Sequence, residues 1–152
     1  PAGAGPDVRF FDANGNALQG SGGPCPSSLI LGETSSESMR LRNFRDTVLQ
    51  ATPAGAQLVA TYYRHAPELV GLLLLDDTLA DQVKDLLTDI LPSVDSAIKG
   101  RTFAVSTATE ERIHAVCDRI ARKAGPELRD TIERLREDFM TGKLVADLGL
   151  SS

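Results

Sequence analysis

From Pro26 onward, apolar side chains recur at helical spacing, and proline or glycine stands at most of the corners between the apolar runs. Apolar residues three and four positions apart lie on one face of an α-helix, which must then be buried against a neighbour. Proline favours the first position of a helix and glycine its end, so these residues mark helix boundaries. The pattern predicts an all-α fold, a bundle of five to six helices joined by short antiparallel turns.

The first two helices have clear capping signals. A serine at position 35 or 36 caps a helix that runs to about residue 50. Thr52 caps the next, with Pro53 at its first position. Pro67 is expected to end that helix, because an internal proline lacks the N–H group and clashes with the preceding turn. Residues 68–75 then form a third helix, which is apolar nearly all round and is predicted to be the buried centre of the bundle.

Further helices are expected in the second half of the chain. An aspartate at position 76 or 77 caps a helix to about residue 91, and Pro92 starts a short continuation of it. Residues 101–105 are predicted to be extended and available to pair with the N-terminal hairpin described below. A capping box beginning at Thr107 opens the next helix, which Gly125 ends, and Pro126 opens the last long one.

Residues 1–24 have a different composition, rich in glycine and proline. Residues 8–11 and 17–19 predict two short strands joined by a type I′ turn at Asn14-Gly15. The chain is therefore divided into a β-hairpin with a linker, residues 1–24, and a helical domain, residues 25–152. An isolated hairpin is marginally stable in water, so this one is expected to dock on the helices or to end an upstream module.

Composition excludes several classes of function. With 152 residues, 41% hydrophobic and 24% charged, the chain is expected to fold as a globular domain. A net charge of -5 argues against a nucleic acid partner, because phosphate binding depends on clustered lysine and arginine. The longest apolar run, residues 69–75, is too short to span a membrane.

The two cysteines leave more than one interpretation open. Cys25 and Cys117 form a disulfide in an oxidising compartment, or else remain a loop thiol and a core thiol. Cys25 as a nucleophile needs a nearby base, and only His65 and His114 are available. His114 and Cys117 lie one helical turn apart, but two ligands do not make a metal site. No metal or cofactor is therefore predicted.

Polar and aromatic residues gather in the first two helices and suggest a surface for a protein partner. The members of this candidate interaction surface are Arg42, Arg45, Tyr62, Tyr63, Arg64 and His65. In the alternative interpretation, the arginines pair with Asp46, Glu37 or Glu68 and only fix helix packing.

Four aspartates recur every four residues and form an acidic ladder along one helical face: Asp77, Asp81, Asp85 and Asp89. Like charges at this spacing repel, so a positive group is expected to offset them. Three basic residues on the helix that opens at Thr107 are candidates: Arg112, Arg119 and Lys123. The other interpretations are a solvated acidic face and, beyond that, calcium or a basic partner.

Three segments resemble the CFI-box C-terminal domain. They are Leu41-Arg42-Asn43-Phe44-Arg45-Asp46, Thr52-Pro53-Ala54-Gly55 and Tyr62-Tyr63-Arg64-His65-Ala66-Pro67. That domain ends surface and secreted bacterial and archaeal proteins, and it combines a Cys-Phe-Ile-Ala-Thr-Ala box with an LRxFRD helix, a T/APG turn and a YYRYSPP-like segment. Here Cys25 is kept, but the Phe-Ile-Ala-Thr run is replaced by Pro-Ser-Ser-Leu. The resemblance, over residues 25–75, implies an extracellular or cell-surface location and no particular activity.

Together these features favour a non-enzymatic interaction or anchoring domain of a secreted or cell-surface protein, with a protein partner or self-association and no cofactor. Two alternatives remain. One is a subunit of an extracellular assembly that uses the N-terminal hairpin for strand addition. The other is a cysteine-dependent hydrolase or transferase that uses Cys25.

Overall fold

The computed structural model describes residues 25–151, and every regular element in this range is helical. The elements in order are α1 (Pro26–Leu31), α2 (Ser36–Thr47), the short 3₁₀ helix η1 (Leu49–Ala51), α3 (Pro53–Leu75), α4 (Asp77–Ile98), α5 (Thr107–Lys123), α6 (Pro126–Met140) and α7 (Lys143–Asp147). The all-α prediction is confirmed, although two short helices, α1 and α7, were not expected. The predicted hairpin lies in residues 1–24, outside the described residues.

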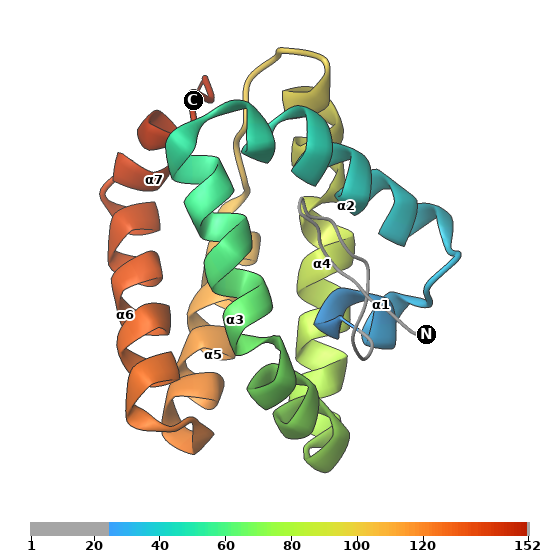
Figure 1. Ribbon diagram of the computed structural model, residues 1–152, viewed down its shortest axis with the longest axis vertical. Helices are drawn as coiled ribbons and strands as arrows, with labels where there is room; N and C mark the ends of the chain where they lie inside the picture. Colours follow the sequence, from blue (N-terminus) through green and yellow to red (C-terminus); the bar gives the residue numbers. More distant parts are fainter. Residues whose placement is uncertain (1–24, 152) are drawn as a thin grey trace, which may run out of the picture.

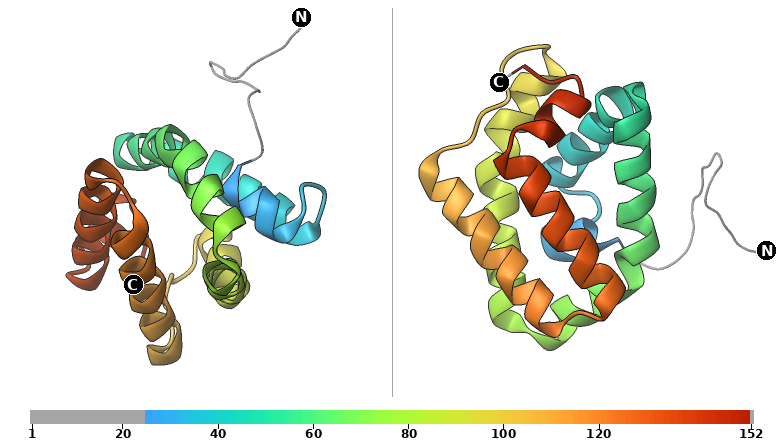
Figure 2. Two further views of the ribbon diagram at one scale, coloured as in Figure 1. Left: turned by 90° about the horizontal axis from the view of Figure 1, so that it is seen from below. Right: turned by 90° about the vertical axis from the view of Figure 1, so that its left-hand side faces the viewer.

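The four long helices α3 to α6 run up and down the molecule and surround a common centre (Figures 1 and 2). Helix α4 packs against both α2 and α5, and α5 packs against α6. The core is built from apolar residues of α3, α4, α5 and α6 together with Ala124, which follows α5: Leu73, Leu79, Val116, Ile120, Ala124 and Leu128. Leucines and isoleucines of α1 and α3 cover its margin.

Side chains cap the long helices largely where the sequence placed them. The oxygens of Ser35, Thr52 and Asp76 accept hydrogen bonds from backbone N–H groups three residues further on, at 3.0–3.1 Å. One prediction was off by a residue, because Ser106 and not Thr107 caps α5, its hydroxyl accepting from the N–H of Thr109 at 3.1 Å. These bonds satisfy backbone donors that a helix start leaves open.

The predicted break at Pro67 was wrong, since this proline lies inside the continuous helix α3. Helix α4 continues past Pro92 to Ile98, in agreement with the predicted short continuation. An internal proline costs a helix roughly 3 kcal/mol, but packing of the turns on both sides can outweigh that cost. In α3, Val59 before the proline and Leu73 after it are both buried. The helix instead changes direction in its lower part (Figure 1), which is the usual effect of a proline.

The end of α3 is less buried than its sequence predicted. Leu73 is 6% exposed and belongs to the core, but Leu74 is 64% exposed and Leu75 is 88% exposed. A helix that is covered on one side buries only that side, whatever the composition of the other. The prediction of a fully buried segment at residues 68–75 was therefore wrong.

Residues 101–105 have no regular structure, and they cross the end of the bundle between α4 and α5 (Figure 1). The backbone N–H of Phe103 donates to the carbonyl of Ser151 at 2.7 Å, and its ring stacks on Phe44 with centroids 6.5 Å apart. The segment thus contacts α2 and the C-terminal residues. Among the described helices, none is both long enough and apolar enough to cross a membrane.

Candidate functional site

The cysteine of the box-like segment begins a network that joins α1, α2 and α3. Cys25 precedes α1, and its Sγ lies 3.3 Å from the Ser27 hydroxyl and 3.2 Å from the Ser28 hydroxyl. Arg42 of α2 donates to the Ser28 hydroxyl at 3.2 Å. From α3, the Tyr62 hydroxyl accepts a hydrogen bond from the backbone N–H of Ser27 at 3.1 Å.

The network continues to the surface through a second tyrosine. The rings of Tyr62 and Tyr63 meet edge to face with centroids 5.3 Å apart. Arg45 of α2 donates to the Tyr63 hydroxyl at 2.7 Å and also binds Asp46 at 2.7 Å. Four of the six residues predicted to form an interaction surface are therefore connected, and Arg45 pairs with Asp46 as the alternative interpretation expected. Of these four residues, Tyr63 is exposed, and Arg42, Arg45 and Tyr62 are partly buried.

His65 and Arg64, the other two predicted members, do not join this network. His65 is 5% exposed, and its Nε2 lies 3.3 Å from the hydroxyl of Thr131 on α6. The imidazole therefore links α3 to α6 inside the bundle, while the neighbouring Arg64 is exposed. The hydrogen-bond partners of Cys25 among residues 25–151 are serine groups, and neither histidine is one of them.

The environment of Cys25 favours its thiolate. Burial alone would raise the pKa of this thiol, but hydrogen bonds from Ser27 and Ser28, with a smaller contribution from Tyr62, outweigh burial and hold the pKa below its ordinary value. For Tyr62 itself, burial raises the pKa of the hydroxyl, which therefore stays protonated. A half-buried thiol whose anion is stabilised by hydroxyl groups can act as a nucleophile or accept a covalent modification.

The disulfide considered above is not formed, because Cys25 and Cys117 are both free. Cys25 immediately precedes α1 and Cys117 lies on α5, and both are half-buried. Burial raises the pKa of Cys117, which makes it the less reactive of the two thiols.

The acidic ladder is only partly offset from within the chain. Arg112 of α5 lies 3.8 Å from Asp85 and 3.1 Å from Asp89. The other two members, Asp77 and Asp81, are exposed and form no ion pair with any residue of the described range. The predicted pairing of the acidic and basic helices therefore holds for the second half of the ladder.

The other two basic residues expected to offset the ladder, Arg119 and Lys123, instead bind an aspartate that the prediction treated only as a helix cap. Arg119 holds the Asp76 carboxylate through two hydrogen bonds, at 2.8 and 3.0 Å, and Lys123 lies 3.5 Å away. The side chain of Asp76 is only 7% exposed. The Arg119 hydrogen bonds and the N–H of Leu79 hold the pKa of this carboxyl far below its usual range. Asp76 thus fixes the corner between α3 and α4 against α5.

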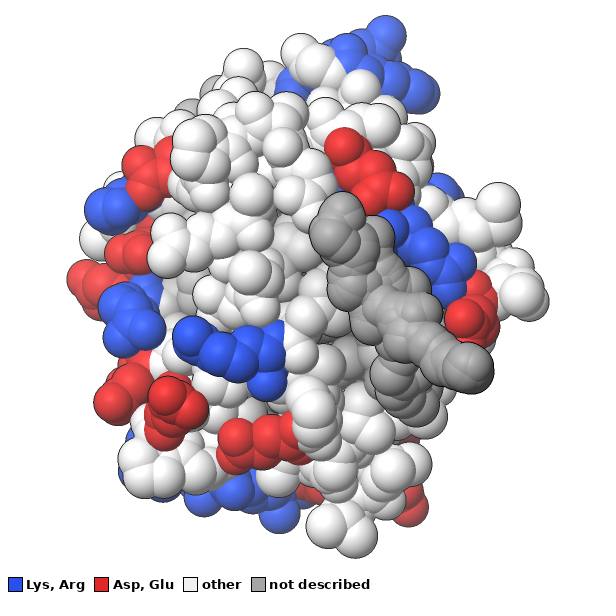
Figure 3. All heavy atoms as spheres, in the orientation of Figure 1, with Lys and Arg blue, Asp and Glu red and all other residues white. Residues whose placement is uncertain are grey.

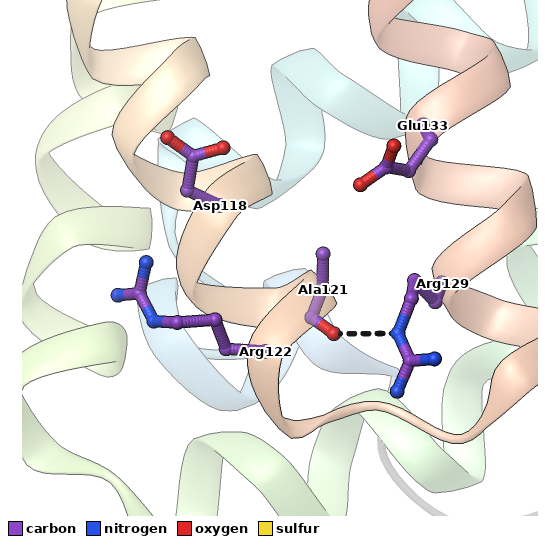
Figure 4. A pocket seen from close by; sticks show the side chains of 5 residues that line it. All are labelled: Asp118, Ala121, Arg122, Arg129 and Glu133. Carbon is purple, nitrogen blue, oxygen red and sulfur yellow. Dashed lines mark hydrogen bonds between the residues drawn. The ribbon is translucent and has the colours of Figure 1, made fainter.

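A shallow depression of about 370 Å³ lies between α5 and α6, lined by Asp118, Ala121, Arg122, Arg129 and Glu133 (Figure 4). Its two arginines do not converge, because Arg129 donates to the carbonyl of Ala121 at 3.0 Å while the side chain of Arg122 points away from Arg129 (Figure 4). Two carboxylates balance their charge. The depression therefore offers no concentrated charge for a ligand. Within residues 25–151, no three His, Cys, Asp or Glu side chains are grouped so that they could hold a metal ion.

Helix α3 has an unusual surface for an exposed helix. Of its 23 residues, only Arg64 and Glu68 belong to the types Asp, Glu, Lys and Arg, whereas the 15 residues of α6 include eight such side chains. The space-filling view shows a broad area with few charges over this part of the molecule (Figure 3). At the lower end of α3, Leu74 and Leu75 are the two most exposed large apolar residues among those described. Sequence reasoning missed this surface, because hydropathy does not reveal which face of an apolar helix remains uncovered.

Comparison of the chain with models of protein families, with curated proteins and with solved structures finds no match. The geometry described above is therefore the basis for the functional proposals that follow.

Proposed function

We propose that this chain is a non-enzymatic interaction or anchoring domain of a secreted or cell-surface protein. The location rests on the resemblance to the CFI-box domain, and the interaction role rests on the molecular surface. Two of the three matching segments, through Arg42 and Tyr62, contribute with the retained Cys25 to one network, which supports the resemblance as a structural unit.

The observation that carries the interaction role is the exposure of Leu74 and Leu75 at the end of a helix with few charges. Burying a leucine side chain is worth about 1.5–3 kcal/mol, so leaving two adjacent leucines in water forgoes a sizeable gain in stability. Exposed apolar groups that gather in one place are typical of surfaces that bind a partner. Tyr63, 43% exposed on the same helix, adds an amphipathic contact of the kind enriched in interfaces.

Site-specific photo-crosslinking in the cells that make the protein tests this role. A photoreactive amino acid is placed at position 75 or 63, and at exposed position 111 of α5 as the control. We expect a discrete adduct with another protein from position 75 or 63 and none from position 111. Equal yields at all three positions, or no adduct at any, would contradict the interaction role. Antibody labelling of intact cells tests the surface location separately.

A second candidate, a hydrolase or transferase that uses Cys25, is favoured by one observation, the lowered pKa of this thiol. Against it, the thiol is surrounded by the hydroxyls of Ser27 and Ser28 and by the backbone N–H of Ser28, which donates to it, and none of these groups is a general base. Alkylation by iodoacetamide at pH 6, followed by mass spectrometry, separates the two functions, with Cys117 as an internal reference. An activated nucleophile labels many times faster than Cys117, whereas similar slow labelling of both cysteines excludes a catalytic thiol.

Strand addition by the N-terminal hairpin involves residues outside the described range and stays a prediction. Comparing the size of the protein in solution with and without residues 1–24 tests it. An unchanged oligomeric state after truncation would exclude strand exchange.

A further inference from the structure

The corner between α3 and α4 combines two kinds of exposed side chain. Leu74 and Leu75 end α3, a single residue, Asp76, makes the turn, and Asp77 begins α4. Asp81 follows one helical turn later and lies on the same face as Asp77. The corner thus carries two exposed leucines at the end of α3 and two exposed carboxylates in the first turns of α4, and we name these residues, 74, 75, 77 and 81, the leucine corner.

The surrounding contacts hold the leucine corner in place without covering it. Asp76 is bound by Arg119 of α5, and Glu68 accepts a hydrogen bond from the N–H of Gly125 at 2.7 Å, so the part of α3 that follows Pro67 is tied to the α5–α6 end of the bundle at both of its ends. Leu73, one position earlier, is buried in the core. The two exposed leucines are therefore presented by a rigid corner, which reduces the entropy cost of binding a partner.

We propose that the leucine corner docks an apolar segment of another protein that carries lysine or arginine beside its apolar side chains. This proposal rests on the interaction role above and adds the chemistry of the partner. The leucines supply apolar contact, and a lysine or arginine of the partner pairs with Asp77 and Asp81 as Arg112 pairs with Asp85 and Asp89.

The same charges disfavour other occupants. Two copies of the chain meeting through this corner would place four carboxylates in one interface, and the four residues of the corner include no basic side chain to pair with them. An anionic membrane surface would be repelled by the same carboxylates. A basic segment is the occupant for which both the apolar and the charged parts of the corner are favourable.

Binding of synthetic helical peptides, measured by fluorescence anisotropy at low and high salt, tests the proposal. The probes are an amphipathic peptide of leucine and lysine and a matched peptide of leucine and glutamate. We expect the lysine peptide to bind and the glutamate peptide not to bind. NMR chemical-shift changes should centre on residues 71–81.

Paired variants identify the groups responsible. Leu74→Ser with Leu75→Ser should weaken binding more than tenfold, whereas Met39→Ser, at a residue 60% exposed on α2, should leave it unchanged. Asp77→Asn with Asp81→Asn should weaken binding about two- to tenfold at low salt and little at high salt. The control removes the same number of charges from exposed positions of α6, through Asp130→Asn and Glu137→Gln.

If the α6 control variant weakens peptide binding as much as Asp77→Asn with Asp81→Asn does, the peptide is attracted by the overall charge of the protein. That result would overturn the proposal. Binding of the glutamate peptide, or shifts centred elsewhere, would overturn it as well. If position 75 crosslinks to a partner in cells while the lysine peptide fails to bind, the partner chemistry is wrong and the interaction role stands. If crosslinking fails at every position, the interaction role itself fails.

Discussion

Gly55, the third residue of α3, should not tolerate even one added methyl group. Its N–H binds the Thr52 hydroxyl at 3.0 Å, and the chain of η1 passes directly against it. A Cβ atom at position 55 would lie 2.0 Å from the carbonyl oxygen of Leu49 and 2.7 Å from its carbonyl carbon. Ordinary contact begins near 3.4 Å, so the backbone of η1 would have to move by 3.4 − 2.0 = 1.4 Å.

Two effects oppose each other in Gly55→Ala. Replacing a helical glycine by alanine gains about 1 kcal/mol through propensity and a less flexible unfolded chain. Overpacking costs about 1–3 kcal/mol, and a clash with backbone belongs at or above the upper end of that range. We therefore expect net destabilisation by about 2 kcal/mol or more, which lowers Tm by at least roughly 4–8 °C for a chain of this length.

Gly71→Ala is the matched control, because it makes the same substitution in the same helix where an added Cβ meets nothing within 4 Å. In this variant only the gain from replacing a helical glycine by alanine remains, so Tm should rise by about 2–4 °C. Both variants are melted in dilute solution, with circular dichroism as the readout, so that association does not contribute. If Gly55→Ala raises Tm as much as Gly71→Ala does, the close approach of η1 to α3 is refuted.

Three further predictions concern the ion pairs and the core. Asp76→Asn should make stability depend less on pH in the acid range. A carboxyl whose folded pKa is lowered adds stability above its unfolded pKa of about 4, and this stability is lost as pH falls further. Equal slopes of Tm against pH between about pH 4 and 2 in variant and wild type would contradict this. Arg112→Gln should lower the unfolding free energy by at most about 1 kcal/mol and only at low salt, as expected for exposed pairs. Arg119→Gln, which removes both arginine hydrogen bonds from the buried Asp76 carboxylate and leaves it the more distant Lys123, should stay destabilising in high salt. Identical salt responses of the two arginine variants in urea melts would refute the distinction. Leu128→Ala, at a side chain 1% exposed, should cost about 2–5 kcal/mol in the same melts, and a loss below 1 kcal/mol would argue against the core described.

The candidate site was predictable in its residues but not in its connections. The Arg42, Arg45, Tyr62 and Tyr63 side chains could be chosen from the sequence because they belong to the segments that carry the family resemblance. Their division into a half-buried part at Cys25 and an exposed part at Tyr63 depends on how α1, α2 and α3 meet. His65 was chosen by the same reasoning and instead faces Thr131, since its position on α3 points into the bundle.

The sequence by itself determined the helical class, most helix starts and the position of the caps. These features depend on interactions within a few residues, such as the Thr52 cap and the spacing of apolar side chains. Tertiary packing decided that Pro67 lies within a helix, that Arg112 offsets only half of the ladder, and that Leu73 is buried while Leu75 is not. Each of these outcomes depends on which distant helix covers a given face, and local sequence carries no record of that.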